Sequence, residues 1–210
     1  MDSVVGVDLS GLWGGRDAPR TVAARIDLTA PLRVSDWLTA RRGPRGDVQL
    51  VDWMVAIHPL VVAIDAPLTL PHSVTCDEPE CTRCELGAAW YTQREVDQAA
   101  RRLGGGMPAV MLAAISFRGM YLARKLGELG LEVIETYPAA AYRAMGAQGK
   151  TYEERAELLG RRLGILDRTD HDAIDAACAA LVAADYAGGR SGGVIEAADG
   201  RIWMATPAEP

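Results

Sequence analysis

The stretch that decides the fold is SVVGVD at residues 3–8, a run of small and β-branched residues that ends in an acid. The same pattern occurs in LVVAID at residues 60–65 and in LEVIE at residues 131–135. Turn-forming residues follow each run, so all three are predicted to be strands. Because the runs are almost continuously apolar, we expect strands that are covered on both faces, as in the parallel part of an α/β sheet.

The acids that end these runs are Asp8, Asp65 and Glu135. Ligands of open α/β sheets bind outside the carboxyl ends of the strands, which is where these three side chains are expected to lie. Two further acids, Asp172 and Asp175, open an Ala-rich helix near the end of the chain and share one helix face. The five carboxylates together predict one shared site.

The composition sets limits on the class of protein. The chain has 210 residues, of which 49% are hydrophobic and 24% charged, and this is typical of one globular domain over residues 1–210. The N-terminus lacks a signal peptide pattern and no apolar stretch is long enough for a bilayer, so we expect a cytoplasmic protein with no membrane association. A net charge of −6 excludes a global basic field for nucleic-acid binding, although bound divalent cations would offset several acids.

The order of the predicted elements indicates a fold. Short connections favour an antiparallel meander of the first strand with two more strands. Three antiparallel strands, a helix, a strand, a helical insertion over about residues 66–130, a strand and a closing helix are the element order of the ribonuclease H-like fold. We therefore expect an α/β protein with a mixed five-stranded sheet flanked by helices. The other expected strands are residues 20–28 and 32–38, the expected helices are residues 48–58, 87–102, 107–129, 152–163 and 171–186, and a short strand is expected in the tail at residues 201–204.

A set of motifs in a fixed order resembles an uncharacterised bacterial and archaeal family described as predicted nucleases of ribonuclease H-like fold. The resemblance covers roughly residues 4 to 186 and implies that fold and a carboxylate site. Nucleic acid is the candidate partner. The cysteine-bearing loop is not part of the resemblance. The motifs are VGVD at residues 5–8, IDAPL at 64–68, Arg94 to Asp97, ETYP at 135–138, KTY at 150–152 and HDAIDA at 171–176.

The chemistry that this resemblance implies is hydrolysis of phosphodiester bonds with metal ions. Two divalent ions about 3.5–4 Å apart activate water and stabilise charge on the attacking and leaving oxygens, and Mg²⁺ or Mn²⁺ prefers oxygen ligands. Our hypothesis is that Asp8 bridges both ions and that Asp65 and either Asp172 or Asp175 each hold one. Glu135 is then a further ligand or an outer base.

Each acid also has a structural interpretation. An acid just past a strand commonly forms a solvated turn or caps a helix. Asp172 lies near a helix N-terminus, where the helix dipole favours a carboxylate whatever its function, and Asp170 is the expected cap. Asp175 lies inside an apolar helix, so it has no comparable alternative, whereas Glu135 could simply lead the chain into solvent.

A second cluster of residues is typical of a metal site. Residues 72–84 contain His72, Cys76, Cys81 and Cys84, and clustered cysteines in a cytoplasmic chain more often indicate metal than a disulfide. Three thiolates and an imidazole would complete a tetrahedral structural Zn²⁺ site. A disulfide or redox pair, free thiols and an iron–sulfur cluster are the alternatives. Cys178 is expected to pack as a small apolar residue.

Basic residues supply candidates for substrate binding. Arg94 and Lys150 fall within the family-like motifs, so they are the candidate phosphate contacts. The alternative for each is a paired charge on a solvated helix face. Two other functions compete with the nuclease: a non-catalytic module that binds nucleic acid, nucleotide or protein on the same scaffold, and an actin-like phosphotransferase, for whose second half 210 residues leave no room.

Overall fold

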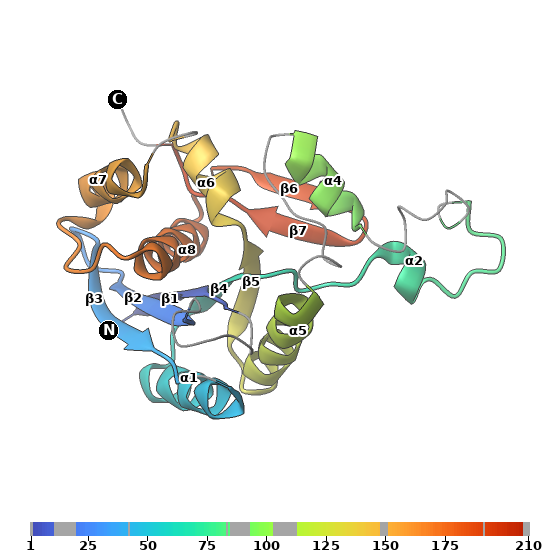
Figure 1. Cartoon of the computed structure of the whole chain (residues 1–210), viewed down its shortest axis with the longest axis horizontal. Helices are drawn as coiled ribbons and strands as arrows, with labels where there is room; N and C mark the ends of the chain where they lie inside the picture. Colours follow the sequence, from blue (N-terminus) through green and yellow to red (C-terminus); the bar gives the residue numbers. More distant parts are fainter. Residues whose placement is uncertain are drawn as a thin grey trace.

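Strands that carry the three acids form the centre of a seven-stranded sheet in the computed structural model (Figure 1). The strands are β1 (Ser3–Asp8), β2 (Val22–Asp27), β3 (Arg33–Thr39), β4 (Val61–Asp65), β5 (Glu132–Thr136), β6 (Val194–Ala197) and β7 (Gly200–Trp203). Their order across the sheet is β3-β2-β1-β4-β5-β7-β6. The structure describes residues 2–10, 20–41, 43–82, 84, 93–102, 113–147, 151–190 and 192–207.

The topology of the first five strands is the predicted one. β1, β2 and β3 form an antiparallel meander, and β1, β4 and β5 run parallel. The predicted α/β class and ribonuclease H-like arrangement are thereby confirmed. Two further strands extend the sheet beyond β5: β7 lies parallel to β5 and pairs with it at Thr136 and Trp203, and β6 forms a hairpin with β7. The tail strand was expected at residues 201–204, whereas β6 was not predicted.

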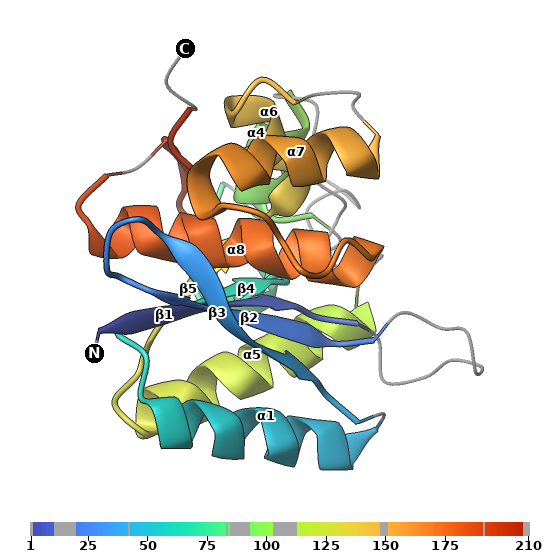
Figure 2. The same cartoon turned by 90° about the vertical axis from the view of Figure 1, so that its left-hand side faces the viewer.

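Helices cover both faces of the sheet, which explains the continuous apolar runs (Figure 2). Helices α6, α7 and α8 lie over one face, and α1 and α5 lie over the other. Along β1, the residues at even positions pack towards α8 and those at odd positions towards α1 and α5. The helix bounds are α1 (Pro44–Ile57), α2 (His72–Thr75), α4 (Glu95–Arg102), α5 (Ala113–Glu128), α6 (Pro138–Ala144), α7 (Tyr152–Leu163) and α8 (His171–Ala187).

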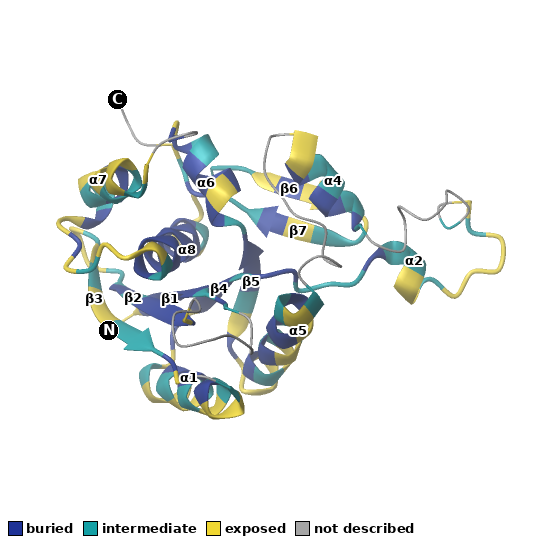
Figure 3. Ribbon diagram, viewed as in Figure 1, coloured by how far each residue is buried: buried dark blue, intermediate teal, exposed yellow. Residues whose placement is uncertain are grey.

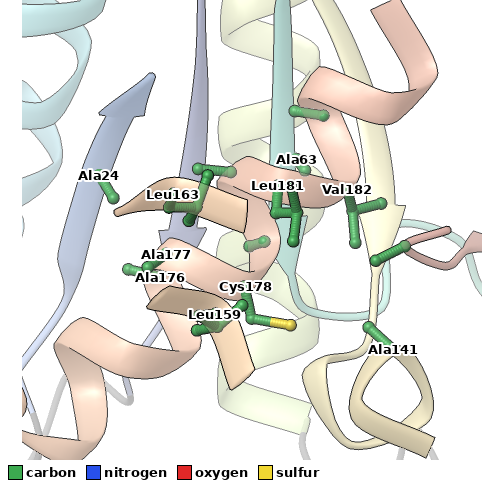
Figure 4. Close-up of a cluster of buried hydrophobic side chains, with 14 of the residues drawn as sticks. Ala24, Ala63, Ala141, Leu159, Leu163, Ala176, Ala177, Cys178, Leu181 and Val182 are labelled. Carbon is green, nitrogen blue, oxygen red and sulfur yellow. The ribbon is translucent and has the colours of Figure 1, made fainter. Parts of the chain in front are cut away.

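Helix α8 lies unusually close to β1 because small residues line the contact. A Cβ atom added to Gly6 would lie 1.9 Å from the backbone nitrogen of Ala180 and 2.4 Å from the carbonyl oxygen of Ala176, so only glycine fits. Figure 4 shows the alanines of α8 in the cluster of buried side chains between the sheet and α7. Every residue from Ala173 to Asp185 is buried, and Figure 3 shows α8 as the most buried helix of this layer.

The predicted helices agree with the observed ones where local signals are strong. Helix α7 has the expected bounds, and Thr151 caps its N-terminus through a capping-box interaction with Glu154. Helix α1 begins at Pro44, four residues before the expected start. Parts of the two helices expected in the insertion, residues 87–92 and 107–112, lie outside the described residues, while α2 and α6 were not predicted. No helix in the described part of the chain is both long and apolar enough to cross a membrane.

Candidate functional site

The first two acids lie side by side on the same face of the sheet. Asp8 and Asp65 are register partners at the ends of the parallel strands β1 and β4. Side chains alternate between the two faces of a strand, so both acids share the face of Gly6 and Ala63. That face packs against α8. The two carboxylates therefore point towards the beginning of the last helix.

Helix α8 brings three more polar side chains to this point. Asp170 caps the helix, with its carboxylate accepting from the amide of Ala173, as expected. His171, Asp172 and Asp8 each offer one ligand atom, and these atoms lie within 4.8 Å of one another. His171 Nδ1 lies 3.4 Å from Asp172 Oδ1 and 3.9 Å from Asp175 Oδ2. We refer to Asp8, Asp65, His171, Asp172 and Asp175 as the acid cluster.

The carboxylates of the acid cluster disfavour one another's ionised form. Burial raises the pKa of Asp8 to about 9, with contributions from the charges of Asp65, Asp175 and Asp172. Burial and then the charge of Asp175 raise the pKa of Asp65 well above its ordinary value. Such mutual repulsion requires either protons or a bound cation.

Asp175 shows the same shortage of positive charge. Its pKa is raised by burial, an effect that the nearby His171 partly offsets. Its Oδ1 atom is buried and has no hydrogen-bond partner among the described residues. A buried carboxylate oxygen without a donor is costly, and a metal ion would satisfy it. Asp172 differs, since it also accepts a hydrogen bond of 2.9 Å from the backbone amide of Arg20.

Glu135, the fifth predicted acid, lies on the opposite face of the sheet. In the register of β4 and β5 it pairs with Ile64, and Thr136 pairs with Asp65. The side chain of Glu135 therefore points away from α8. Its two carboxylate oxygens accept hydrogen bonds of 2.6 and 2.7 Å from Arg94, and the amide of Leu68 donates a third.

Arg94, a predicted phosphate contact, is the buried partner of Glu135. Its side chain is 1% exposed and also pairs with Asp97 at 2.6 Å and donates to Thr69. The guanidinium thus joins β5, α4 and the segment after β4, and its donors face protein acceptors. Lys150, the second predicted phosphate contact, lies outside the described residues.

His171 is the site residue that sequence reasoning missed. It is the first residue of α8 and stands one and four positions before the two acids of the helix, a spacing that places His171 and Asp175 on one face. The HDAID motif contained this signal. The prediction used only its carboxylates.

The predicted cysteine-rich cluster comes together in the structure. His72, Cys76, Cys81 and Cys84 each offer one ligand atom, and all four atoms lie within 4.8 Å of one another. The turn of α2 sets Cys76 above His72, with the Cys76 amide donating to the His72 carbonyl, and a second turn joins Cys81 to Cys84. No disulfide joins the four cysteines among the described residues, and Cys178 is buried in α8 as expected. We refer to His72, Cys76, Cys81 and Cys84 as the Cys/His cluster.

A cavity of about 930 Å³ lies away from the acid cluster, where β5 and β7 diverge. Its lining includes Glu135 and His72 together with Glu132, Tyr186 and Trp203. None of the five acid-cluster residues lines it. The cavity therefore lies beside the Cys/His cluster and the buried Arg94–Glu135 ion pair. It is separate from the acid cluster.

The fold and the acid cluster define a ribonuclease H-like protein with carboxylates gathered at the carboxyl ends of two parallel strands. The chain belongs to the family described as "Protein of unknown function (DUF429)", whose model matches residues 6–199. The expected resemblance to an uncharacterised family of ribonuclease H-like fold is thereby confirmed.

Comparison with one solved structure supports the same fold, and a second solved structure matches the chain as well. The structure of RuvC from Thermus thermophilus has a TM-score of 0.50 and 16% sequence identity, and the match covers 89% of this chain and 96% of that chain. A second structure, T. thermophilus RuvC in complex with Holliday junction substrate, has a TM-score of 0.49 and 16% identity, over 90% and 97% of the two chains. No curated protein matches the chain.

Proposed function

We propose that this protein is a divalent-metal-dependent nuclease that hydrolyses phosphodiester bonds at the acid cluster. The observation that carries the proposal is the convergence of Asp8, Asp172 and His171 within reach of one ion. Asp65 and the buried, unpartnered Oδ1 of Asp175 lie beside them on the same face. Oxygen ligands of this kind suit Mg²⁺ or Mn²⁺, and an imidazole is compatible with Mn²⁺.

Each residue of the acid cluster would have its own role in binding the metal ions. Asp8 is the register partner of Asp65 and offers a ligand atom within 4.8 Å of those of Asp172 and His171, so it is the candidate for a ligand shared between two ions. Asp65, Asp172 and Asp175 would each bind through their ionised carboxylates, and His171 through its neutral imidazole. Bound ions supply an activated water and stabilise charge on the phosphate oxygens. Glu135 has a different role in this proposal, since it holds Arg94 and the segment after β4 in place.

Nucleic acid is the proposed substrate class. The likeness to RuvC supports the fold alone at 16% identity, so the substrate follows from the carboxylate chemistry. The net charge of −6 opposes binding of a polyanion without metal. We therefore expect nucleic-acid binding to depend on divalent ions that neutralise the acid cluster.

The test is cleavage of single-stranded, duplex and branched DNA and RNA in the presence of Mg²⁺ or Mn²⁺. Asp8→Asn should abolish metal-dependent cleavage, because it removes the proposed shared ligand, while thermal unfolding remains cooperative. Glu196→Gln is the matched control, since Glu196 is an acid on β6 that pairs with Arg201 outside the acid cluster. Equal activity of Asp8→Asn and wild type would contradict the assignment. Metal-dependent binding without cleavage would instead indicate a non-catalytic module.

We propose zinc as the ion of the Cys/His cluster. Three thiols and one imidazole are a standard donor set of closed structural zinc sites, in which ligand atoms lie about 2.0–2.3 Å from the ion. His72 Nε2 already lies 3.4 Å from Cys81 Sγ. Burial and the neighbouring Cys76 and Cys81 thiols raise the pKa of Cys84 to about 12, as expected for thiols that share a site without a cation.

Metal analysis of the purified protein tests the zinc site. We expect about one zinc per chain and its loss in Cys81→Ser, since removing one of four ligands opens the site. Cys178→Ala is the control, because Cys178 is buried in α8 and remote from the cluster in the chain. Iron in place of zinc, or equal zinc content in Cys81→Ser and wild type, would contradict the proposal.

A further inference from the structure

One half-buried cation near the acid cluster, Arg155, has no carboxylate partner among the residues that the structure describes. Arg155 is on the first turns of α7, three residues after Tyr152, so the two side chains share a helix face. The capping box of Thr151 and Glu154 fixes this end of the helix. Helix α7 packs directly on α8, which carries the acids.

Two aromatic rings hold the guanidinium of Arg155 in place. Its Cζ atom lies 4.9 Å from the ring centre of Tyr142 and 4.8 Å from that of Tyr152. Both contacts are within the range of cation–π attraction. The rings are themselves tied to α8, because the Tyr142 hydroxyl donates to the carbonyl of Ile174 at 3.0 Å and the Tyr152 ring lies 4.2 Å from the ring of His171.

The donors of Arg155 differ from those of three other arginines that are buried or partly buried. Arg94, Arg118 and Arg162 each form a close salt bridge with a carboxylate. Arg155 forms no salt bridge with any carboxylate in the described residues, and its Nε is buried without a hydrogen-bond partner there. Its positive charge lowers the pKa of Asp175, which places the guanidinium in the electrostatic range of the acid cluster.

We propose that Arg155 binds a non-bridging oxygen of the phosphate group on which the acid cluster acts. The proposal rests on the proposed function and adds a substrate contact to it. A guanidinium presents N–H donors in a planar fork that matches phosphate oxygens. Here the two tyrosines hold that fork before substrate arrives. The substrate contact is therefore separate from Arg94, whose donors face Glu135 and Asp97.

The experiment measures oligonucleotide affinity in Ca²⁺ as a function of salt, with single-stranded and duplex DNA as probes. Loss of one phosphate contact should reduce the slope of log affinity against log salt by about 0.7 for single strands and about 0.9 for duplex. Arg155→Met should show this reduction and bind about tenfold more weakly. Arg155→Lys should keep the slope, since it retains the charge, and lose part of the affinity.

Arg161→Met is the matched control, because Arg161 is an exposed arginine on the same helix that pairs with Glu157. It should retain the wild-type slope and affinity. Equal slopes for Arg155→Met and wild type would overturn the proposal, as would a change in Mn²⁺ affinity without a change in slope. If Arg155→Met does not fold, the affinity of Arg155→Lys for the oligonucleotides and its salt dependence test the proposal instead. Binding without cleavage by wild type overturns the nuclease function alone, and absence of all nucleic-acid binding overturns both proposals.

Discussion

Asp65 and Glu135 lie at the carboxyl ends of the neighbouring parallel strands β4 and β5, after similar apolar runs. The charges around the two side chains are nevertheless of opposite sign. Glu135 meets the buried guanidinium of Arg94 on one face of the sheet. Asp65 meets other carboxylates on the other face, and no salt bridge to it is found in the described part of the chain. The difference shows that the protein supplies a cation for one acid and leaves the other to be neutralised from outside. An acid without an internal cation is the better candidate for binding a metal ion.

The largest expected change in the free energy of unfolding comes from removing the cation that neutralises Glu135. Arg94→Met should lower the free energy of unfolding by about 3–5 kcal/mol, because it leaves buried Glu135 and Asp97 without their cation. Chemical denaturation measures this. Arg124→Met is the control, since Arg124 and Glu128 form an exposed ion pair whose loss should leave the free energy of unfolding nearly unchanged. Equal stabilities of the two variants would show that the buried pair contributes nothing particular.

Neutralising the two acids should have effects of opposite sign. In metal-free protein at pH 7, Asp65→Asn should raise the free energy of unfolding, because burial and neighbouring carboxylates raise the pKa of Asp65 and a neutral amide does not carry this penalty. Glu135→Gln should lower it, because Arg94 loses an ionised partner. The measurement is denaturation in a chelator. Destabilisation by both substitutions would contradict the comparison.

The stability of the metal-free protein should depend on pH in a direction set by Asp8. Its pKa is raised to about 9 in the folded state from an ordinary value of 3.8, so between these values the folded chain holds a proton that the unfolded chain has released. Stability is therefore complete below pH 4 with respect to this group and is lost as the pH rises towards 9, by at most about 1.4 kcal/mol per pH unit.

Asp8→Asn isolates this contribution. The variant should show a weaker loss of stability between pH 5 and pH 9 than wild type, as measured by denaturation at several pH values in a chelator. A pH profile unchanged by the substitution would exclude a raised pKa at Asp8.

The smallest predicted effect is stabilisation by the metal itself. At ten times its dissociation constant, Mn²⁺ should raise the free energy of unfolding by about 1.4 kcal/mol through preferential binding to the folded state. The shift in melting temperature should disappear in Asp8→Asn and persist in Glu196→Gln. An equal shift in all three proteins would place the ion elsewhere.

Much of this fold was predictable because its signals are local. The apolar runs identified the central strands, and the helix expected over residues 152–163 coincides with α7. The grouping of His72, Cys76, Cys81 and Cys84 within residues 72–84 likewise predicted a metal site, and their ligand atoms lie close together in the structure. By contrast, β6 is a four-residue strand recognisable only through its pairing with β7.

The side on which each acid lies was not predictable from local pattern. Asp65 and Glu135 end similar runs, but the register of β5 against β4 pairs Ile64 with Glu135 and so reverses its direction. Register depends on packing of the whole sheet. The Arg94 partnership is hidden for a related reason, since 41 residues separate the two side chains. His171 was missed because a histidine at a helix start is unremarkable until the helix is seen against β1.

Because residue 6 is a glycine, α8 can lie close to β1, and this close approach affects how the site could evolve or be redesigned. The distance between α8 and β1 fixes how far Asp172 and Asp175 lie from Asp8, and that distance is set by a contact between Gly6 and the backbone at Ala176 and Ala180. Metal affinity should therefore be sensitive to methyl-sized changes at positions that carry no polar atom. A saturation screen scored by ion binding should identify these three positions together with the ligands, and a designer who wished to admit a larger ion would begin with them.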